Sequence, residues 1–502
     1  MSTSDPLATA TLPPAGSSPT PGTAPDPLTT AHLSPRLYNE DLAPRRPSTI
    51  WRTWDLFCVW MSAVHSLGGY TFAVGLLVLG LNGWQMVLAM VGGVAIVHLG
   101  CNLMGVAGQR LGVPFPVFAR VSFGVFGANV PALLRAVVAI FWYAIQTYLA
   151  SAAVMILVLK LVPAAADWTR SSFLGLSGLG WLCFLGLWLV QLVVLHRGME
   201  TVRRLSDLAG PVIWVAMLAL AVWVLARAGW HLDWGYHEGT GMTTGNVVVA
   251  VLSGIFLTVS YFAGPMLNYA DFARFAPDER TVLRGNRLGL PLNASAFCLV
   301  SVIIALGTVQ LYGKAISDPV QLVAEVDSTA VLLLGTVAFA LATVGVNIVL
   351  NFVSPAYDLA NTFPKRISFK TGGLITALLA LVVLPWQIYS NPVAVNYFLG
   401  GVGALMGPLF GILLADYYLV RRAKVDVAQL YTDAASGAYH YRRGTNLRAV
   451  AALAASGSVT LVVALVPALT HLAPYAWPIG VALGVVSCLA FHSGRTASVV
   501  NS

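Results

Sequence analysis

The sequence predicts an all-α integral membrane protein with twelve transmembrane helices, arranged as two inverted repeats of five helices plus two C-terminal helices. Of its 502 residues, 57% are hydrophobic and only 10% are charged, whereas about 25% of the residues in a soluble domain are charged. Apolar stretches recur along the chain, and about 20 such residues cross a bilayer as a helix. The first and sixth stretches are both interrupted, which an inverted five-helix repeat predicts.

The apolar stretches set the expected order of elements. We predict spans near residues 56–81, 84–106, 131–161, 173–195, 205–229, 246–270, 289–312, 329–352, 372–389, 395–419, 447–468 and 472–494. The corresponding regions are a disordered cytoplasmic tail (1–49), the first repeat (50–230), the second repeat (231–420), a cytoplasmic loop (421–446), helices 11 and 12 (447–495) and a short cytoplasmic tail (496–502). Disorder of the first tail is expected because it is rich in Pro, Thr, Ser and Gly.

The basic residues indicate the orientation of the chain. With a cytoplasmic N-terminus, the outer loops carry only Lys160, Arg170, Arg227 and Lys314, which leaves 24 of the 28 Lys and Arg on the inner side. The positive-inside rule therefore predicts a multi-pass protein of the inner or plasma membrane with both termini in the cytoplasm. We expect a monomer whose partners are the lipid bilayer and a small molecule, without nucleic acid.

The first span contains a break in an unusual place. No Asp, Glu, Lys or Arg lies between Asp55 and Arg110, yet Ser66 and the adjacent Gly68–Gly69 pair weaken the helix. A broken helix is tolerated in hydrocarbon only where the freed backbone groups face protein, water or a ligand. The break therefore marks a candidate binding site, and a packing glycine pair or a benign kink is the alternative.

The third span carries an aromatic and an amide side chain on one helix face. Trp142 and Gln146 are four residues apart, so their side chains are neighbours on a helix. An indole beside an amide suits a planar polar heterocycle, because the ring stacks while the amide pairs with ring N–H and C=O groups. The alternative is that Gln146 bonds to a neighbouring helix and Trp142 belongs to the core.

The sixth span repeats the break of the first span, and the eighth span repeats the polar helix face of the third. The sixth is interrupted at Ser260–Pro265, because Pro265 removes a backbone donor and Gly264 permits a bend. In the eighth, Asn347 and Asn351 are four residues apart, as Trp142 and Gln146 are in the third. Substrates of inverted-repeat transporters bind near the midplane, where both broken helices unwind.

One titratable residue lies in the first break. His65 can change charge near neutral pH, or it can remain neutral and donate to a backbone carbonyl. The five cysteines lie inside spans at no metal-ligand spacing, so we expect neither a metal site nor a cofactor.

At these residues the sequence resembles the nucleobase:cation symporter family, which comprises permeases for hydantoins, allantoin, uracil, cytosine and related purines. The similarity runs from Asn39 to about Asn446. It includes Phe141–Trp142 through Gln146–Thr147, Asn268 through Asp271, Asn351 through Tyr357, Thr362–Pro364, Leu384–Gln387, and Gly407–Leu409 leading into Asp416–Arg422. The resemblance implies a LeuT-like fold and a permease rather than an enzyme.

The resemblance also implies which residues bind the substrate. The family's stacking tryptophan and amide-binding glutamine fall on Trp142 and Gln146, and its helix 8 asparagine falls on Asn351. The second stacking aromatic falls on Phe262, where many members have Trp. The Gln or Asn that is common at the first break is here Ser66, and we include the adjacent His65 among the candidate substrate-binding residues.

The cation site departs from the family pattern. Members that use sodium bind it with carbonyls at the positions of Ser62, His65 and Ala342, and with hydroxyls at two further positions that are here Gly345 and Val346. A hard cation requires about six oxygen ligands, so the loss of two predicts that sodium binds poorly. We therefore expect co-transport of a proton, or no coupling ion, and His65 and Asp271 are the titratable candidates.

The predicted function is secondary active import of a planar nucleobase-like heterocycle, of the hydantoin, allantoin or uracil class, by alternating access. A cytosine or purine permease coupled to sodium is the alternative, and a substrate sensor that does not transport is a second. An enzyme is disfavoured because no span carries a recognisable catalytic arrangement.

Overall fold

The computed structural model describes residues 33–45, 51–197, 199–238, 243–316, 329–389 and 392–492. These residues are mostly helical, and one short antiparallel hairpin pairs β1 (Ser172–Phe173) with β2 (Leu176–Ser177). The predicted 496–502 tail lies outside the described residues, as do positions 1–32 and 46–49 of the predicted N-terminal tail.

Helices fill the first half of the chain. They are α1 (Thr53–Val64), α2 (Leu67–Gly75), η1 (Leu76–Leu79), α3 (Gly83–Leu111), α4 (Phe115–Phe118), α5 (Arg120–Phe123), α6 (Asn129–Leu161), η2 (Pro163–Thr169), α7 (Gly178–His196) and α8 (Met199–Arg227).

The second half is built in the same way. Its helices are α9 (Thr244–Tyr261), α10 (Ala263–Leu267), α11 (Ala270–Ala273), α12 (Glu279–Tyr312), α14 (Thr329–Val346), the π-helical η3 (Asn347–Phe352), α15 (Val353–Thr362), α16 (Phe369–Val382), α17 (Pro385–Tyr389), α18 (Pro392–Leu414), the π-helical η4 (Ala415–Val420), η5 (Ala428–Tyr431), α19 (Leu447–Leu465), η6 (Pro467–Tyr475) and α20 (Ala476–His492).

Many of these helices can cross a membrane. Among the described residues, nine are long and apolar enough, and the pair formed by Thr53–Val64 and Gly68–Leu79 is a tenth candidate bent by 62°. Two shorter apolar helices, Gly178–Val194 and Phe369–Val382, lie where the fourth and ninth spans are predicted. The helical membrane class is confirmed, and the count of twelve stays a prediction.

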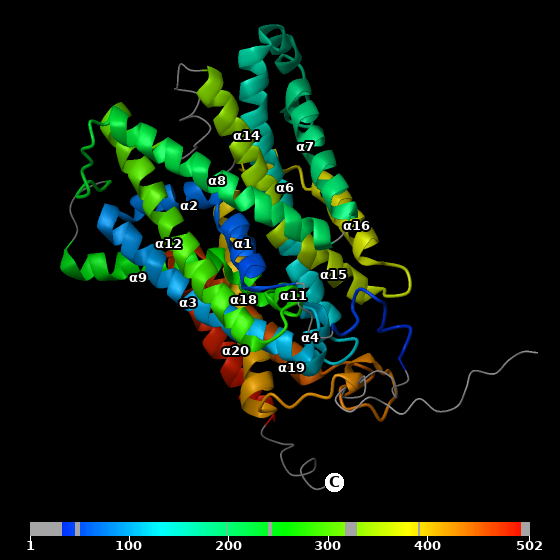
Figure 1. The fold of residues 1–502 in the computed structure, drawn as a ribbon. Helices are drawn as coiled ribbons and strands as arrows, with labels where there is room; N and C mark the ends of the chain where they lie inside the picture. Colours follow the sequence, from blue (N-terminus) through cyan, green and yellow to red (C-terminus); the bar gives the residue numbers. More distant parts are fainter. Residues whose placement is uncertain are drawn as a thin grey trace, which may run out of the picture.

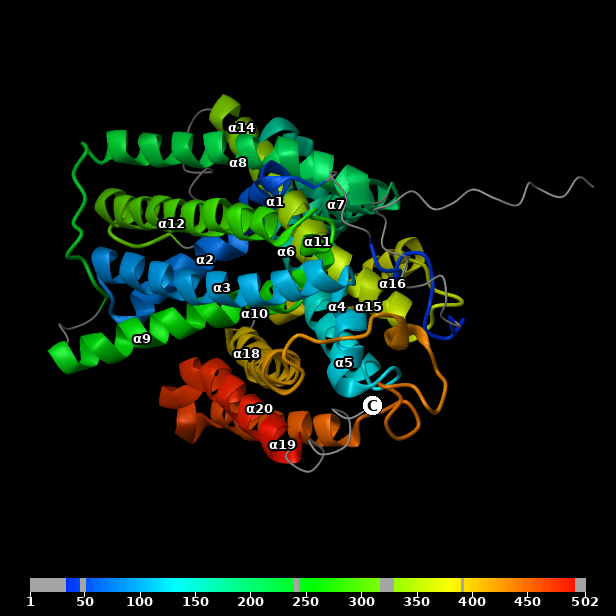
Figure 2. The same cartoon turned by 60° about the horizontal axis from the view of Figure 1, so that its bottom comes forward.

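Small residues bring the helices into close contact. α8, α12, α3 and α9 lie side by side in this order (Figure 2). A Cβ atom added at Gly289 of α12 would lie 2.6 Å from the Trp60 ring of α1, and one at Gly93 of α3 would lie 2.5 Å from Thr258 of α9. Glycine at these crossings permits backbone approach, which drives helix association in membranes. The last two helices, α19 and α20, pack on α18 (Figures 1 and 2).

Part of the predicted disordered tail is folded. Within residues 1–49, the structure places 33–45 as a series of turns on the same end of the bundle as the loop after α15. Leu37 and Leu42 are fully buried, and the Asn39 side chain donates to a backbone carbonyl of that loop at 3.3 Å. The prediction of disorder was wrong for this part, because two apolar anchors outweigh a tail composition that is otherwise polar.

Candidate binding site

The first span breaks where the sequence predicts. His65 and Ser66 have extended backbone angles between α1 and α2. The Ser66 hydroxyl accepts from the Gly69 amide at 2.9 Å and pairs with the Tyr261 hydroxyl at 3.1 Å. Ser66 is thus the N-cap of α2, a role that its short side chain suits, and it also links the first broken span to the sixth.

The sixth span breaks as predicted, and the eighth departs from regular α-helix. Phe262 and Asn268 have non-helical angles on either side of α10. Between α14 and α15 the chain forms a π-helical turn, η3, that contains both Asn347 and Asn351. Such π-turns are rare and are frequent at functional sites.

These irregular segments and α6 line a small cavity of about 30 Å³. It is lined by Ala63, Arg135, Val138, Trp142, Gln146, Tyr261, Phe262, Gly264, Pro265, Val346, Leu350 and Asn351. Four of the predicted substrate residues therefore meet here: Trp142, Gln146, Phe262 and Asn351. The cavity has room for about two or three water molecules, so a bound ring requires the walls to move apart.

Gln146 lies directly against the first break. It is 2% exposed, and its Oε1 atom has no hydrogen-bond partner among the described residues. A Cβ atom added at Gly68 would lie 3.1 Å from its Nε2 atom. Glycine at this position therefore lets the amide approach the backbone of α2, and the amide remains available for a ligand.

Asn351 is held by a buried network of neutral groups. Its Nδ2 atom donates to Asn347 Oδ1 at 3.0 Å. Asn347 Nδ2 in turn lies 3.2 Å from the Tyr143 carbonyl, 3.0 Å from Thr147 Oγ1 and 2.9 Å from Gln191 Oε1. The network joins α6, α7 and η3, so it fixes one wall of the cavity.

Sequence analysis did not single out Arg135, which also lines the cavity. Its guanidinium donates to the Gly264 carbonyl at 3.2 Å, to Asn268 Oδ1 at 3.0 Å and to the Leu350 carbonyl at 3.0 Å, and its Nη1 atom has no partner among the described residues. One buried arginine thus ties α6 to the unwound part of span six and to η3. The sequence signal that could have identified Arg135 is its spacing: it precedes Trp142 by seven residues, or about two turns, and therefore lies on the same helix face.

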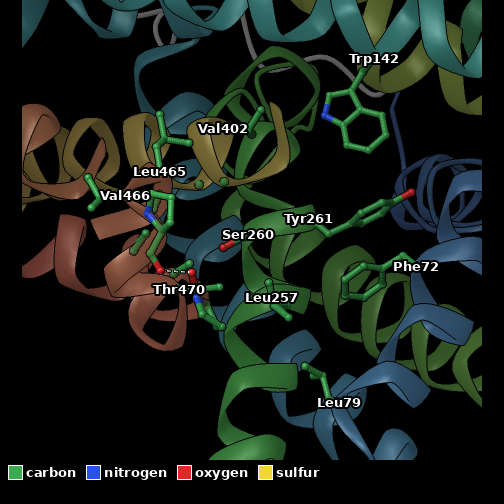
Figure 3. Close-up of a pocket in the computed structure, with 17 residues that line it drawn as sticks. Phe72, Leu79, Trp142, Leu257, Ser260, Tyr261, Val402, Leu465, Val466 and Thr470 are labelled. Atoms are coloured by element: carbon green, nitrogen blue, oxygen red, sulfur yellow. Dashed lines mark hydrogen bonds between the residues drawn. The ribbon is translucent and has the colours of Figure 1, made fainter. Parts of the chain in front are cut away.

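A larger pocket adjoins the cavity. It has a volume of about 510 Å³, is mostly apolar and shares Trp142 and Tyr261 with the cavity. Figure 3 shows Trp142, Tyr261 and Phe72 on one side of this pocket and Leu465 and Val466 on the other. The Tyr261 ring stacks on Phe72 at 5.1 Å and meets Trp142 edge-on at 5.6 Å. Tyr261, which sequence reasoning also missed, therefore borders both spaces, as Trp142 does.

The structure does not bring His65 and Ser66 to the cavity wall. The His65 ring packs edge-on against Trp214 of α8 and Phe297 of α12, and its Nδ1 atom lies 2.6 Å from the Met61 carbonyl. The contact with a backbone carbonyl is the arrangement that sequence analysis kept as the alternative. Ser66 contacts a residue of the cavity wall through its hydrogen bond with Tyr261.

The predicted cation positions lie where α1 crosses α14. A Cβ atom added at Gly345 would lie 3.6 Å from Ser62 Cβ. Ser62 Oγ donates to the Ser206 carbonyl at 3.2 Å, so this hydroxyl is already used. Ala342 is buried on α14, and Val346 lines the small cavity.

Asp271 does not line the cavity. It is fully buried on α11 and accepts from the Phe115 amide at 2.8 Å. Asn268 connects it to the site, because Asn268 Nδ2 donates to Asp271 Oδ2 at 3.3 Å while its Oδ1 atom accepts from Arg135.

A bundle with two broken spans that meet at a small cavity lined by aromatic and amide side chains defines a membrane permease of the inverted-repeat class. Residues 46–480 match the family described as permeases for cytosine/purines, uracil, thiamine and allantoin, and the chain belongs to that family. The family consists of permeases rather than enzymes.

Individual relatives agree with this assignment. An allantoin permease of Bacillus subtilis is 35% identical over 89% of this chain and 91% of its own length, and a purine-uracil permease of Arabidopsis thaliana is 33% identical over 88% of this chain and 73% of its own. The nucleobase-cation-symport-1 transporter Mhp1, in a closed conformation with bromovinylhydantoin bound, matches the structure with a TM-score of 0.75 at 24% identity, covering 90% of this chain and 96% of Mhp1. The predicted LeuT-like fold class is thereby confirmed.

Proposed function

We propose that the chain imports a planar nucleobase-like ring of the hydantoin, allantoin or uracil class, bound in the small cavity at the two helix breaks. The observation that carries the proposal is that Trp142, Gln146, Phe262 and Asn351 line one cavity although they come from three separate spans. Two aromatic side chains and two amides can hold a flat ring with polar edges, because each ring face finds an aromatic and each edge an amide. The relatives that carry allantoin and uracil support this substrate class.

The route through the protein follows from the two pockets. A ring enters the larger pocket from outside, passes Tyr261 and reaches the cavity. For release to the cytoplasm, we propose that the contacts of Arg135 with Gly264 and Asn268 break, since they join α6 to span six at the cavity wall. Under this proposal both termini are cytoplasmic and the monomer is the transporting unit.

We propose that a proton or the substrate gradient alone, rather than sodium, drives import. Gly345 has no side chain to offer and Val346 has no oxygen, so the crossing of α1 and α14 provides too few ligands for a hard cation. Asp271 is the better titratable candidate, because Asn268 connects it to Arg135 at the cavity wall. The His65 ring packs away from the cavity.

Uptake into proteoliposomes tests this function. Purified protein should accumulate labelled allantoin, uracil or hydantoin saturably, and Gln146→Ala protein at the same density should accumulate much less at the same ring concentration. Saturable binding without uptake would point to a sensor, and failure of all three rings to bind would overturn the proposed function.

A further inference from the structure

The hydrogen-bond network behind Asn351 fixes which end of its amide faces the cavity. The two ends of an amide look alike in size, so its orientation must be read from its partners. A backbone carbonyl can only accept a hydrogen bond. Wherever such a carbonyl meets a side-chain amide, the group facing it must therefore be the NH₂ group.

Two backbone carbonyls anchor the network. Asn347 faces the Tyr143 carbonyl at 3.2 Å, and Gln191 faces the Leu187 carbonyl at 3.2 Å. Both amides must direct nitrogen toward these carbonyls, which leaves Gln191 Oε1 free to accept from Asn347 Nδ2 at 2.9 Å. Turning either amide around would place its oxygen against a carbonyl oxygen. The orientation of the two amides is therefore fixed by two independent carbonyl contacts.

The orientation of the Asn347 amide fixes the orientation of the Asn351 amide at the cavity. Because Asn347 directs its nitrogen toward α6 and α7, its Oδ1 atom faces Asn351 and accepts from Asn351 Nδ2 at 3.0 Å. Asn351 cannot turn without opposing two oxygens. Its own Oδ1 atom takes no hydrogen bond from the described residues, and Asn351 lines the cavity. The cavity therefore presents a fixed acceptor at this wall.

A fixed acceptor selects the group that faces it. Hydantoin, allantoin and uracil each contain an imide N–H, a ring nitrogen that lies between two carbonyls and is a strong donor. Cytosine has a lone pair at the same ring position, which would repel the oxygen. Leaving a buried acceptor unpaired is costly, so the two kinds of ring should differ clearly in affinity.

We propose that Asn351 Oδ1 accepts the imide N–H of the substrate, and that Asn347 and Gln191 are positioning residues that make the site selective for cyclic imides over cytosine. This inference rests on the proposed function and adds to it the polarity of the ring edge that is recognised. Gln146 lacks such anchors, since its Oε1 atom has no partner among the described residues, so its amide can turn to suit either kind of edge.

The test is equilibrium binding by full-length protein in detergent. The probes are uracil, hydantoin, allantoin, cytosine and the N3-methylated form of whichever imide binds. Wild-type protein should bind at least one imide about tenfold or more tightly than cytosine, and the N3-methyl form should bind as poorly as cytosine. Equal affinity for cytosine, or retained binding of the N3-methyl form, would overturn the inference, whereas absence of binding by every imide would overturn the proposed function.

Variants test the positioning role. In Asn347→Leu, Asn351 is free to turn, so the ratio of imide to cytosine affinity should fall several-fold. Gln191→Leu should lower the ratio less, because Tyr143 and Thr147 still hold Asn347. Ser301→Ala removes a buried hydroxyl of α12 that has no partner among the described residues, and this control should keep the wild-type ratio. An unchanged ratio in monodisperse Asn347→Leu or Gln191→Leu protein would contradict the proposal.

Discussion

At Gln146 a buried amide oxygen has no partner among the described residues, and the amide nitrogen lies against the backbone of α2. A ligand that pairs with this amide replaces an unsatisfied group by a hydrogen bond, and each such bond contributes about 1 to 3 kcal/mol when its loss strands a buried partner. We predict that Gln146→Ala weakens ring binding about tenfold or more without loss of folding. The dissociation constant of the ring, measured on both purified proteins, checks this. Gln109→Ala is the control, because it alters a glutamine of α3 that lies outside the cavity. Wild-type affinity in the Gln146 variant would remove this residue from the site.

Trp142 and Phe262 supply the two aromatic faces of the proposed site. Loss of one face removes apolar burial and about 0.5 to 1.5 kcal/mol of specific ring interaction. Trp142→Ala and Phe262→Ala should each weaken binding, while Phe262→Trp should be tolerated because the ring face is kept. If only one of the two alanine variants altered the dissociation constant, the ring would not be held between them.

The sequence located some site residues and not others, for physical reasons. Trp142 and Gln146 could be predicted to lie side by side because residues four positions apart are neighbours on any α-helix. Arg135 was not predicted, since an arginine near the predicted cytoplasmic end of a span looks like a topology anchor. The direction of the His65 ring depends on α8 and α12, which are distant in sequence, so no local pattern could reveal it.

The break in the first span brings the backbone of α2 close to the Gln146 amide, and this contact can be tested. Both Gly68 and Gly75 belong to α2, but a Cβ atom at Gly68 meets the Gln146 amide at 3.1 Å, whereas one at Gly75 meets nothing within 4 Å. Gly68→Ala should therefore displace the amide and weaken binding several-fold, and Gly75→Ala should not. Thermal unfolding and binding measured on both variants separate this local effect from a general effect on helix α2. Equal behaviour of the two variants would mean that the approach is unimportant.

Elements were predicted unevenly. Both broken spans followed from Gly, Pro and Ser in apolar stretches, because such residues interrupt helices wherever they occur. The π-turn η3 did not, since the sequence Asn347–Phe352 also fits an ordinary α-helix and only the surrounding contacts select the wider turn. The folded 33–45 segment was missed because Leu37 and Leu42 become apolar anchors only when the loops that cover them are in place.

For the whole molecule, the coupling ion decides how import is driven. We predict that uptake persists when sodium is replaced by choline at constant pH, because the side chains of Gly345 and Val346 contain no oxygen that could bind sodium. An imposed pH gradient across a sodium-free membrane should increase accumulation if a proton is carried. His65→Ala should retain this response, since the ring packs against Trp214 and Phe297 outside the cavity. Strict dependence on sodium would contradict the ion assignment and leave the substrate site unaffected.

Under the proposed function, the transported ring occupies the cavity at the two helix breaks. The most direct measurement is a cryo-electron microscopy map of the protein saturated with whichever of allantoin, uracil or hydantoin it transports. We predict ring density between Trp142 and Phe262, within hydrogen-bonding distance of Gln146 and Asn351. Density for the ring only in the larger pocket beside Leu465 and Val466, with the cavity still closed, would show that the ring does not bind at the helix breaks.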